Sequence, residues 1–81
     1  MAKPSPNHAG DAMLVALGKA IKASRAEIEI SQEALAVDAD LDRSYLGGIE
    51  RGEHNLTVIN LAKISHALGL SPSDLLQKAN H

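Results

Sequence analysis

The residues best suited to bind another molecule are Arg43, Ser44 and Tyr45, at the start of a predicted helix. At about 100° per residue, Leu46 and Ile49 turn inward and leave that end of the helix exposed. An arginine in such a place can donate to guanine O6 and N7 together, a contact that discriminates among bases by about 1–3 kcal/mol. Ser44 can hydrogen-bond a base or a phosphate. We therefore predict that these three residues contact DNA bases.

Two of these assignments have open alternatives. Arg43 could instead contact a phosphate, or form a surface ion pair with Asp42 or Glu50. Tyr45 is the only aromatic residue of the chain. It could be a wedge against the DNA backbone or a residue packed on the rim of the core.

A second set of residues suits the DNA backbone. Gln32 begins the preceding predicted helix, where its amide and the free backbone N–H groups can donate to a phosphate. Arg51, Asn55 and Thr57 belong to the loop that leads into the next helix, and Lys22 lies on the solvent side of the first helix. We predict phosphate contacts for all five. As alternatives, Gln32 is an ordinary exposed residue and Lys22 a solvated surface charge.

The same helix and loop contain three further residues of interest. His54 is expected to contribute to phosphate binding at low pH, although the neighbouring Glu53 argues against a strong contact by this loop. Gly47 and Gly48 are expected to face outward. Either their bare backbone lets the helix approach the groove closely, or they touch nothing. In both cases few side chains read bases, and DNA shape carries more of the specificity.

Five short helices are expected to position these residues. Each helix should follow a residue that can cap its free backbone N–H groups, namely Asp11, Ser31, Asp42, Thr57 and Ser71. Gly52 and Gly69 can end the third and fourth helices, because glycine readily adopts positive φ. Asp40 should adopt the left-handed conformation in the turn at 38–42. The apolar residues expected inward are Leu14, Leu17, Ile21, Ile28, Leu41, Leu46, Ile49, Val58, Leu61, Ile64, Leu68, Leu75 and Leu76.

Length and composition narrow the class of protein. A chain of 81 residues forms one domain. It has no cysteine and four scattered histidines, so we expect no disulfide, metal or cofactor. It contains no run of about 18 apolar residues and no signal peptide, and a cytoplasmic location is predicted. No nucleophile–base pair or phosphate-binding loop is visible, so an enzyme is not expected.

The net charge of −2 argues against nucleic-acid binding, but the local charge on one face matters more.

The chain is expected to contain two parts. Residues 1–10 lack apolar periodicity and are rich in proline and polar residues, which predicts a flexible N-terminal arm. Residues 11–81 carry the helical pattern and form the predicted domain. Gly18, within the first helix, should allow a close approach by another helix, at a cost of about 1 kcal/mol in helix propensity.

The pattern over residues 14–77 resembles the Cro/CI-type (XRE) family of helix-turn-helix regulators. The matching segments are Leu17-Gly18, Ile21-Lys22, Arg25, Ser31-Gln32-Glu33, Leu35-Ala36, 41–46, 49–52 and 68–71. Residues 41–56 are especially similar to controller proteins of restriction–modification systems. The resemblance implies an all-α, compact five-helix lambda-repressor-like DNA-binding domain. It also implies an ion pair between Arg25 and Glu50, a phosphate contact by Gln32, and a dimer on a two-fold operator.

Dimerisation is also expected on physical grounds, because one subunit reads only about half a turn of DNA. The predicted interface is the fifth helix with the end of the fourth, and its candidate residues are Ile59, His66, Leu70 and Leu76. The alternative is that Leu70 and Leu76 only complete the core. The short chain leaves no room for a ligand-binding domain, so no small-molecule effector is expected.

The function predicted from the sequence is a sequence-specific DNA-binding transcriptional regulator. The alternatives are a helix-turn-helix protein-interaction adaptor and a toxin–antitoxin antitoxin. The sequence does not distinguish a controller protein from a phage-type repressor.

Overall fold

The computed structural model describes residues 9–81, and this part of the chain consists of five helices and no strand. They are α1 (Ala12–Glu27), α2 (Gln32–Asp38), α3 (Arg43–Glu50), α4 (Val58–Ala67) and α5 (Pro72–Lys78). The all-α, five-helix fold predicted from the sequence is therefore confirmed. The predicted arm at 1–10 falls largely on residues 1–8, which lie outside the described part, so the division of the chain into an arm and a domain stays a prediction.

All five helices begin where the sequence predicts. Each is preceded by a side-chain oxygen that accepts a hydrogen bond from a backbone N–H of the first turn. These caps are Asp11, Ser31, Asp42, Thr57 and Ser71. Such a bond satisfies a donor that has no partner inside the helix, which is why short polar residues mark these starts.

Several turns between helices contain a residue with positive φ. Gly52 and Gly69 have φ of 76° and 75°, and Asp40 has φ of 56°, as the sequence predicts. Glu29, between α1 and α2, also has φ of 55°, and no residue-type signal predicted it. A short polar side chain tolerates this region better than a glutamate does. At Glu29 the turn is closed by bonds from the Glu29 N–H to the Ala26 carbonyl at 3.1 Å and from the Ile30 N–H to the Arg25 carbonyl at 3.2 Å, a pattern that often ends a helix.

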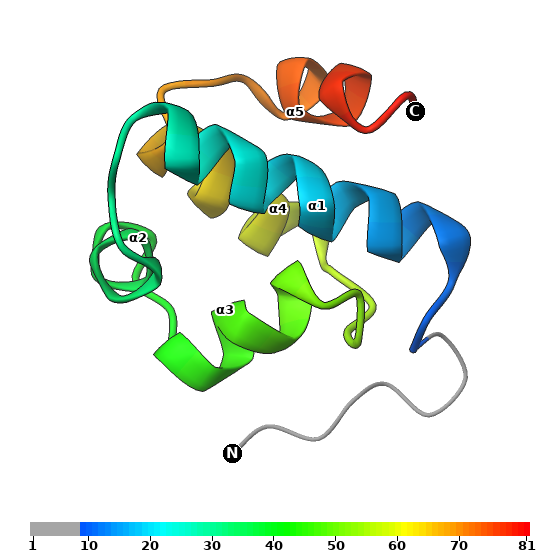
Figure 1. Cartoon of the computed structure of the whole chain (residues 1–81), viewed down its shortest axis with the longest axis horizontal. Coiled ribbons are helices and arrows are strands. Elements are labelled where there is room, and N and C mark those ends of the chain that lie inside the picture. Colours follow the sequence, from blue (N-terminus) through cyan, green and yellow to red (C-terminus); the bar gives the residue numbers. More distant parts are fainter. Residues whose placement is uncertain (1–8) are drawn as a thin grey trace.

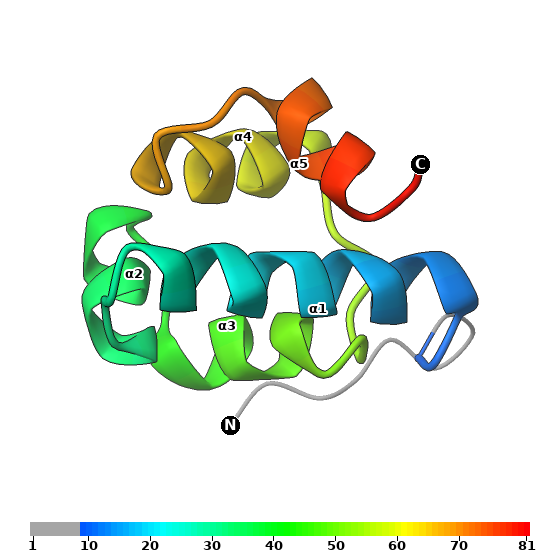
Figure 2. The ribbon, with the colours of Figure 1, turned by 45° about the horizontal axis from the view of Figure 1, so that its top comes forward.

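Helix α1 runs through the middle of the molecule, with α3 on one side and α5 on the other (Figure 1). The view in Figure 2 shows α4 and α5 together above α1, and α3 below it. Helix α2 crosses one end of this arrangement and packs against α3 and α4. The shared core is aliphatic and consists of Leu17, Ala20, Ile21, Leu35, Ala36, Ala39, Leu46, Ile49, Leu61, Ile64, Leu68, Leu75 and Ala79.

Gly18 sets the distance between α1 and α3. A Cβ at this position would lie 2.5 Å from the carbonyl oxygens of both Ile49 and Glu50. The predicted close approach is confirmed, and the partner is the backbone at the end of α3. Because backbone cannot rotate away as a side chain can, any larger residue at position 18 must displace one helix from the other.

Two apolar residues that the sequence places inward are exposed. Ile28 is 47% exposed and Val58 is 78% exposed, so both predictions were wrong. Ile28 is the C-cap of α1, where the chain is already leaving the helix. Val58 is the first residue of α4, in a segment, 57–59, that is exposed throughout. Periodicity identifies the inward face of a helix but not how far that face extends beyond its packing partner.

Within residues 9–81, no helix is long and apolar enough to span a membrane.

Candidate nucleic-acid interface

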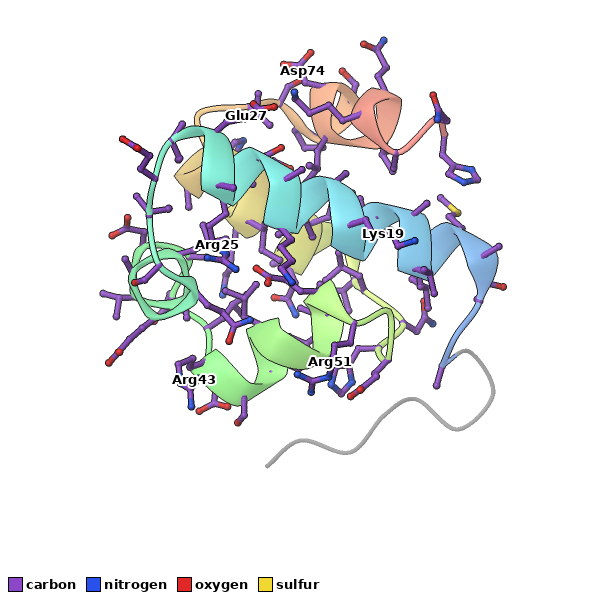
Figure 3. The ribbon with its side chains drawn as sticks, in the orientation of Figure 1. Lys19, Arg25, Glu27, Arg43, Arg51 and Asp74 are labelled. Carbon is purple, nitrogen blue, oxygen red and sulfur yellow. The ribbon has the colours of Figure 1, made fainter. Side chains whose placement is uncertain are left out.

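The start of α3 presents Arg43 to solvent. Arg43 is exposed, and Figure 3 shows its side chain at the edge of the molecule, with Arg51 at the other end of the same helix. No ion pair involves Arg43 within the described part of the chain. The predicted alternative, a surface ion pair with Asp42 or Glu50, does not form. The guanidinium is therefore available to a ligand that approaches this end of α3.

Asp42 organises the backbone next to Arg43. Its carboxylate accepts from the N–H groups of Ser44 and Tyr45, at 3.1 Å each, and from the Ser44 hydroxyl. The bond from Ser44, followed by that from the Tyr45 N–H, lowers the pKa of this exposed carboxyl group. The Ser44 hydroxyl thus already donates its hydrogen bond to Asp42 within the protein. A base or phosphate would have to replace Asp42 as its acceptor, or else donate to the Ser44 oxygen.

Tyr45 lies partly inside the protein. Its ring is half-buried, with its centroid 4.8 Å from that of His54. Its hydroxyl accepts from Asn60 Nδ2 at 3.1 Å. The residue thus connects α3 to the following loop and to α4. In this placement the ring packs on the rim of the core, while the hydroxyl proton is still available to a ligand.

Arg25 and Glu50 form an ion pair between α1 and α3. Arg25 donates to both carboxylate oxygens, from Nε at 2.9 Å and from Nη2 at 3.1 Å. Its Nη1 donates to the carbonyl of Ile30 at 3.1 Å. The Glu50 side chain is only 4% exposed. A carboxylate removed from water to this extent needs such a partner, so the pair ties the two helices together.

Gln32 extends this pair toward the surface. Its amide nitrogen donates to Glu50 Oε1 at 3.1 Å, so the half-buried side chain is oriented by the same carboxylate that holds Arg25. The sequence did not predict this bond. With this bond formed, the Gln32 amide oxygen and the N-terminus of α2 lie beside α3.

Gly47 and Gly48 are buried, so the expectation that they face outward was wrong. A Cβ at Gly47 would lie 3.3 Å from Gln32 Oε1 and 3.2 Å from Arg51 Nη1, so these two side chains close over it. A Cβ at Gly48 would overlap the ring of His54. The alternative that the two glycines touch nothing was therefore wrong, while the close approach of this helix to a DNA groove stays a prediction.

His54 is buried, with only 6% of its surface exposed. The expectation that His54 contributes to phosphate binding assumed an exposed side chain, and that assumption was wrong. The side chain turns inward because Gly48 leaves room for the imidazole and Tyr45 provides a ring to pack on. The only sequence signal for this burial is the glycine six residues before the histidine. That signal can be interpreted only when the path of the loop is known.

Arg51 and Glu53 pair with each other on the surface of the loop. Arg51 donates from Nε to Glu53 Oε2 at 2.7 Å and from Nη2 to Oε1 at 3.3 Å. This pairing raises the pKa of Arg51 and lowers that of Glu53. Both residues therefore stay charged around neutral pH, and a phosphate would have to compete with Glu53 for Arg51.

The other residues predicted to contact phosphates are exposed. Lys22 is exposed on α1, and Asn55 is exposed in the loop before α4. Thr57 is exposed too, but its hydroxyl oxygen accepts from the Asn60 N–H at 3.1 Å as the N-cap of α4. Gln32, Arg51, Asn55 and Thr57 thus lie on α2, at the end of α3 and in the segment that follows it.

The predicted dimer residues differ in exposure. Ile59 is 68% exposed, and His66 is also exposed on the same helix. Leu70 and Leu76 are half-buried and pack against the core. Ile59 and its neighbour Val58 form an exposed apolar pair at the start of α4.

Comparison with known proteins agrees with this geometry. A family model for helix-turn-helix proteins (HTH_3) matches residues 21–75. The control protein C.MunI of Mycoplasma sp is 42% identical over 62 residues, which cover 75% of this chain and 84% of C.MunI. The control protein C.BamHI of Bacillus amyloliquefaciens is 53% identical over 47 residues, and the chain spans only 58% of its length.

A solved structure shows the same fold. The restriction-modification controller protein C.AhdI from Aeromonas hydrophila superposes with a TM-score of 0.75 at 42% identity, over 76% of this chain and 94% of C.AhdI. These relatives are controller proteins rather than enzymes, which confirms two predictions from the sequence, the family resemblance and the absence of an enzymatic function. The chain therefore belongs to the Cro/CI-type (XRE) helix-turn-helix family of DNA-binding transcriptional regulators, and its relatives include restriction–modification controller proteins.

Proposed function

We propose that this protein binds double-stranded DNA sequence-specifically and regulates transcription as a homodimer on a two-fold operator. The start of α3 enters the major groove, with Arg43 as the main base-reading residue. The observation that carries this proposal is the free, exposed Arg43 guanidinium at the start of α3. An arginine in that place fits the recognition of guanine, and the N-terminus of the adjacent α2 fits a phosphate.

The remaining residues of the proposed site have supporting roles. Ser44 and Tyr45 flank Arg43 and contact the same base pairs or the adjacent backbone. Gln32, Arg51, Asn55, Thr57 and Lys22 contact phosphates. Because Glu53 competes for Arg51 and the net charge is −2, few counterions are released per subunit. We expect affinity to fall less steeply with salt than it does for a strongly basic domain.

The test begins with selection of binding sites from a random double-stranded DNA library, followed by footprinting. Arg43→Ala is then compared with Lys22→Ala on the selected site. We expect Arg43→Ala to weaken specific binding by about 1–3 kcal/mol and to relax the preference at one base position. Lys22→Ala should weaken binding to all sequences alike and make the salt dependence shallower. If the Arg43 variant selects the same site with the same affinity, Arg43 does not read bases.

Dimerisation is proposed through α5 and α4, with Ile59, His66, Leu70 and Leu76 at the interface. Ile59 is the most suitable position for a test, because it is apolar and 68% exposed. Two subunits about 34 Å apart can read successive half-sites on one side of the DNA. Protein concentration, rather than a small-molecule effector, then sets occupancy of the operator. In this proposal the regulator acts in the cytoplasm.

Sedimentation of a charged variant tests the interface. We expect the wild-type protein to sediment as a dimer at tens of micromolar and Ile59→Asp to sediment as a monomer, because a carboxylate would be buried against an apolar surface. Val37→Asp is the matched control, since Val37 is 73% exposed on α2 and Ile59 is 68% exposed. The assignment is wrong if the wild type remains monomeric or if both variants behave alike.

A further inference from the structure

His54 occupies a buried position that the proposed DNA contacts do not explain. Its Nε2 is buried and has no hydrogen-bond partner among the described residues. The ring fills the space beside Gly48, where even a methyl group would overlap it, and packs on Tyr45 with a centroid distance of 4.8 Å. An unsatisfied buried polar atom costs about 1–3 kcal/mol, so its retention calls for an explanation.

The contacts of His54 join the two parts of the proposed DNA surface. Tyr45 belongs to α3, next to Arg43, and its hydroxyl accepts from Asn60 on α4. His54 belongs to the loop that carries Asn55 and Thr57. The imidazole, Tyr45 and Asn60 thus hold the base-reading end of α3 at a fixed position relative to the loop. A shift between these parts would prevent them from contacting one stretch of DNA at the same time.

The ring of His54 is held by packing. Gly48 and Tyr45 face it from α3, and Asn60, on α4, donates to the Tyr45 hydroxyl. Both oxygens of the nearby Glu53 carboxylate accept from Arg51. The placement of the imidazole therefore depends on its fit beside Gly48 and on Tyr45, and a side chain without a ring would leave that space empty.

We infer that His54 is a positioning residue for DNA binding, which packs between Gly48 and Tyr45 and holds α3 and the following loop in the DNA-binding arrangement. This inference rests on the proposed function. Because the role requires a ring at this position, a phenyl side chain should replace the imidazole in part, and a methyl group should not.

The first test compares the DNA affinities of two variants. The probe is the double-stranded oligonucleotide selected by the wild-type protein. We expect His54→Ala, which leaves the space beside Tyr45 empty, to weaken binding at least about fivefold more than His54→Phe, which keeps an aromatic ring there. Equal affinities of the two variants, or a His54→Ala variant that binds as tightly as the wild type, would overturn the inference.

The second test measures coupling between positions 48 and 54. Gly48→Ala places a methyl group 2.6 Å from His54 Cδ2 and nearer still to Nε2. We expect it to weaken DNA binding by about tenfold in the wild-type background and much less in the His54→Ala background, where the space is empty. His54→Phe should also bind more tightly than His54→Ala at pH 7.5. Additive effects of the two substitutions would contradict the inference.

The controls separate this inference from the proposed function. Circular dichroism establishes that the variants compared are folded. A wild-type protein that selects no DNA sequence would refute the proposed function itself. If the wild-type protein binds DNA, but His54→Ala and His54→Phe bind equally well and positions 48 and 54 are not coupled, only the role of His54 is refuted.

Discussion

Replacing Glu50 with alanine is expected to lower the free energy of unfolding by about 3–5 kcal/mol, the cost of breaking a buried ion pair by removing one partner. Glu50 accepts two bonds from Arg25 and one from Gln32. In Glu50→Ala, Arg25 retains only the Ile30 carbonyl. A domain of this size has a total stability of about 5–15 kcal/mol, so the expected loss is a large fraction of it.

Thermal melting followed by circular dichroism measures this effect. We expect the Tm of Glu50→Ala to fall by more than about 10 °C. The double variant Arg25→Met/Glu50→Leu should recover part of the loss, because it removes both charges and leaves no unpaired one. A Tm within a few degrees of the wild type for Glu50→Ala would show that the pair does not stabilise the fold. A double variant less stable than Glu50→Ala would show that charge pairing is not the reason.

The second large effect is expected for Gly18→Ala. Helix propensity alone predicts a gain of about 1 kcal/mol from alanine within α1. The structure predicts the opposite sign, because the new methyl group would lie 2.5 Å from two backbone carbonyl oxygens of α3. Overpacking of this kind costs about 1–3 kcal/mol, and more where backbone must move. We expect a net loss of at least about 2 kcal/mol in chemical denaturation.

Gly47→Ala is the matched control for this prediction. It also introduces a methyl group within a helix, but its nearest neighbours are the ends of the Arg51 and Gln32 side chains, at 3.2 and 3.3 Å. These ends can move at little cost, so the propensity term should dominate, and the variant should be as stable as the wild type or slightly more so. If Gly18→Ala is as stable as Gly47→Ala, the contact between α1 and α3 is not as close as the structure shows.

The helices themselves were predictable from the sequence because their signals are local. A cap such as Ser31 or Thr57 bonds to a backbone group three residues away. Gly52 adopts positive φ because it has no side chain. The inward positions of Leu46 and Ile49 follow from the helical repeat. The family resemblance, also carried by short motifs, was confirmed. Each of these conclusions depends on neighbours within about one helical turn.

The details of the proposed site were less predictable, because they depend on side chains that meet across elements. Periodicity assigned Gly47 and Gly48 to the outside, but Gln32 from α2 and His54 from the loop cover them. The amide of Gln32 was expected to be directed at a ligand, and one of its bonds goes to Glu50. Conversely, Ile28 and Val58 look apolar enough for the core but lie beyond the helices that could cover them.

The sequence alone determined where the five helices begin, where the third and fourth end, and which end of α3 presents an arginine. Hydrogen bonds and steric limits within a few residues control those properties. The tertiary structure alone decided that the loop histidine turns inward and that two glycines are covered. It also decided that one carboxylate serves both Arg25 and Gln32. These outcomes depend on the space left between segments distant in the sequence, and that space exists only after α1, α2 and α3 have packed together.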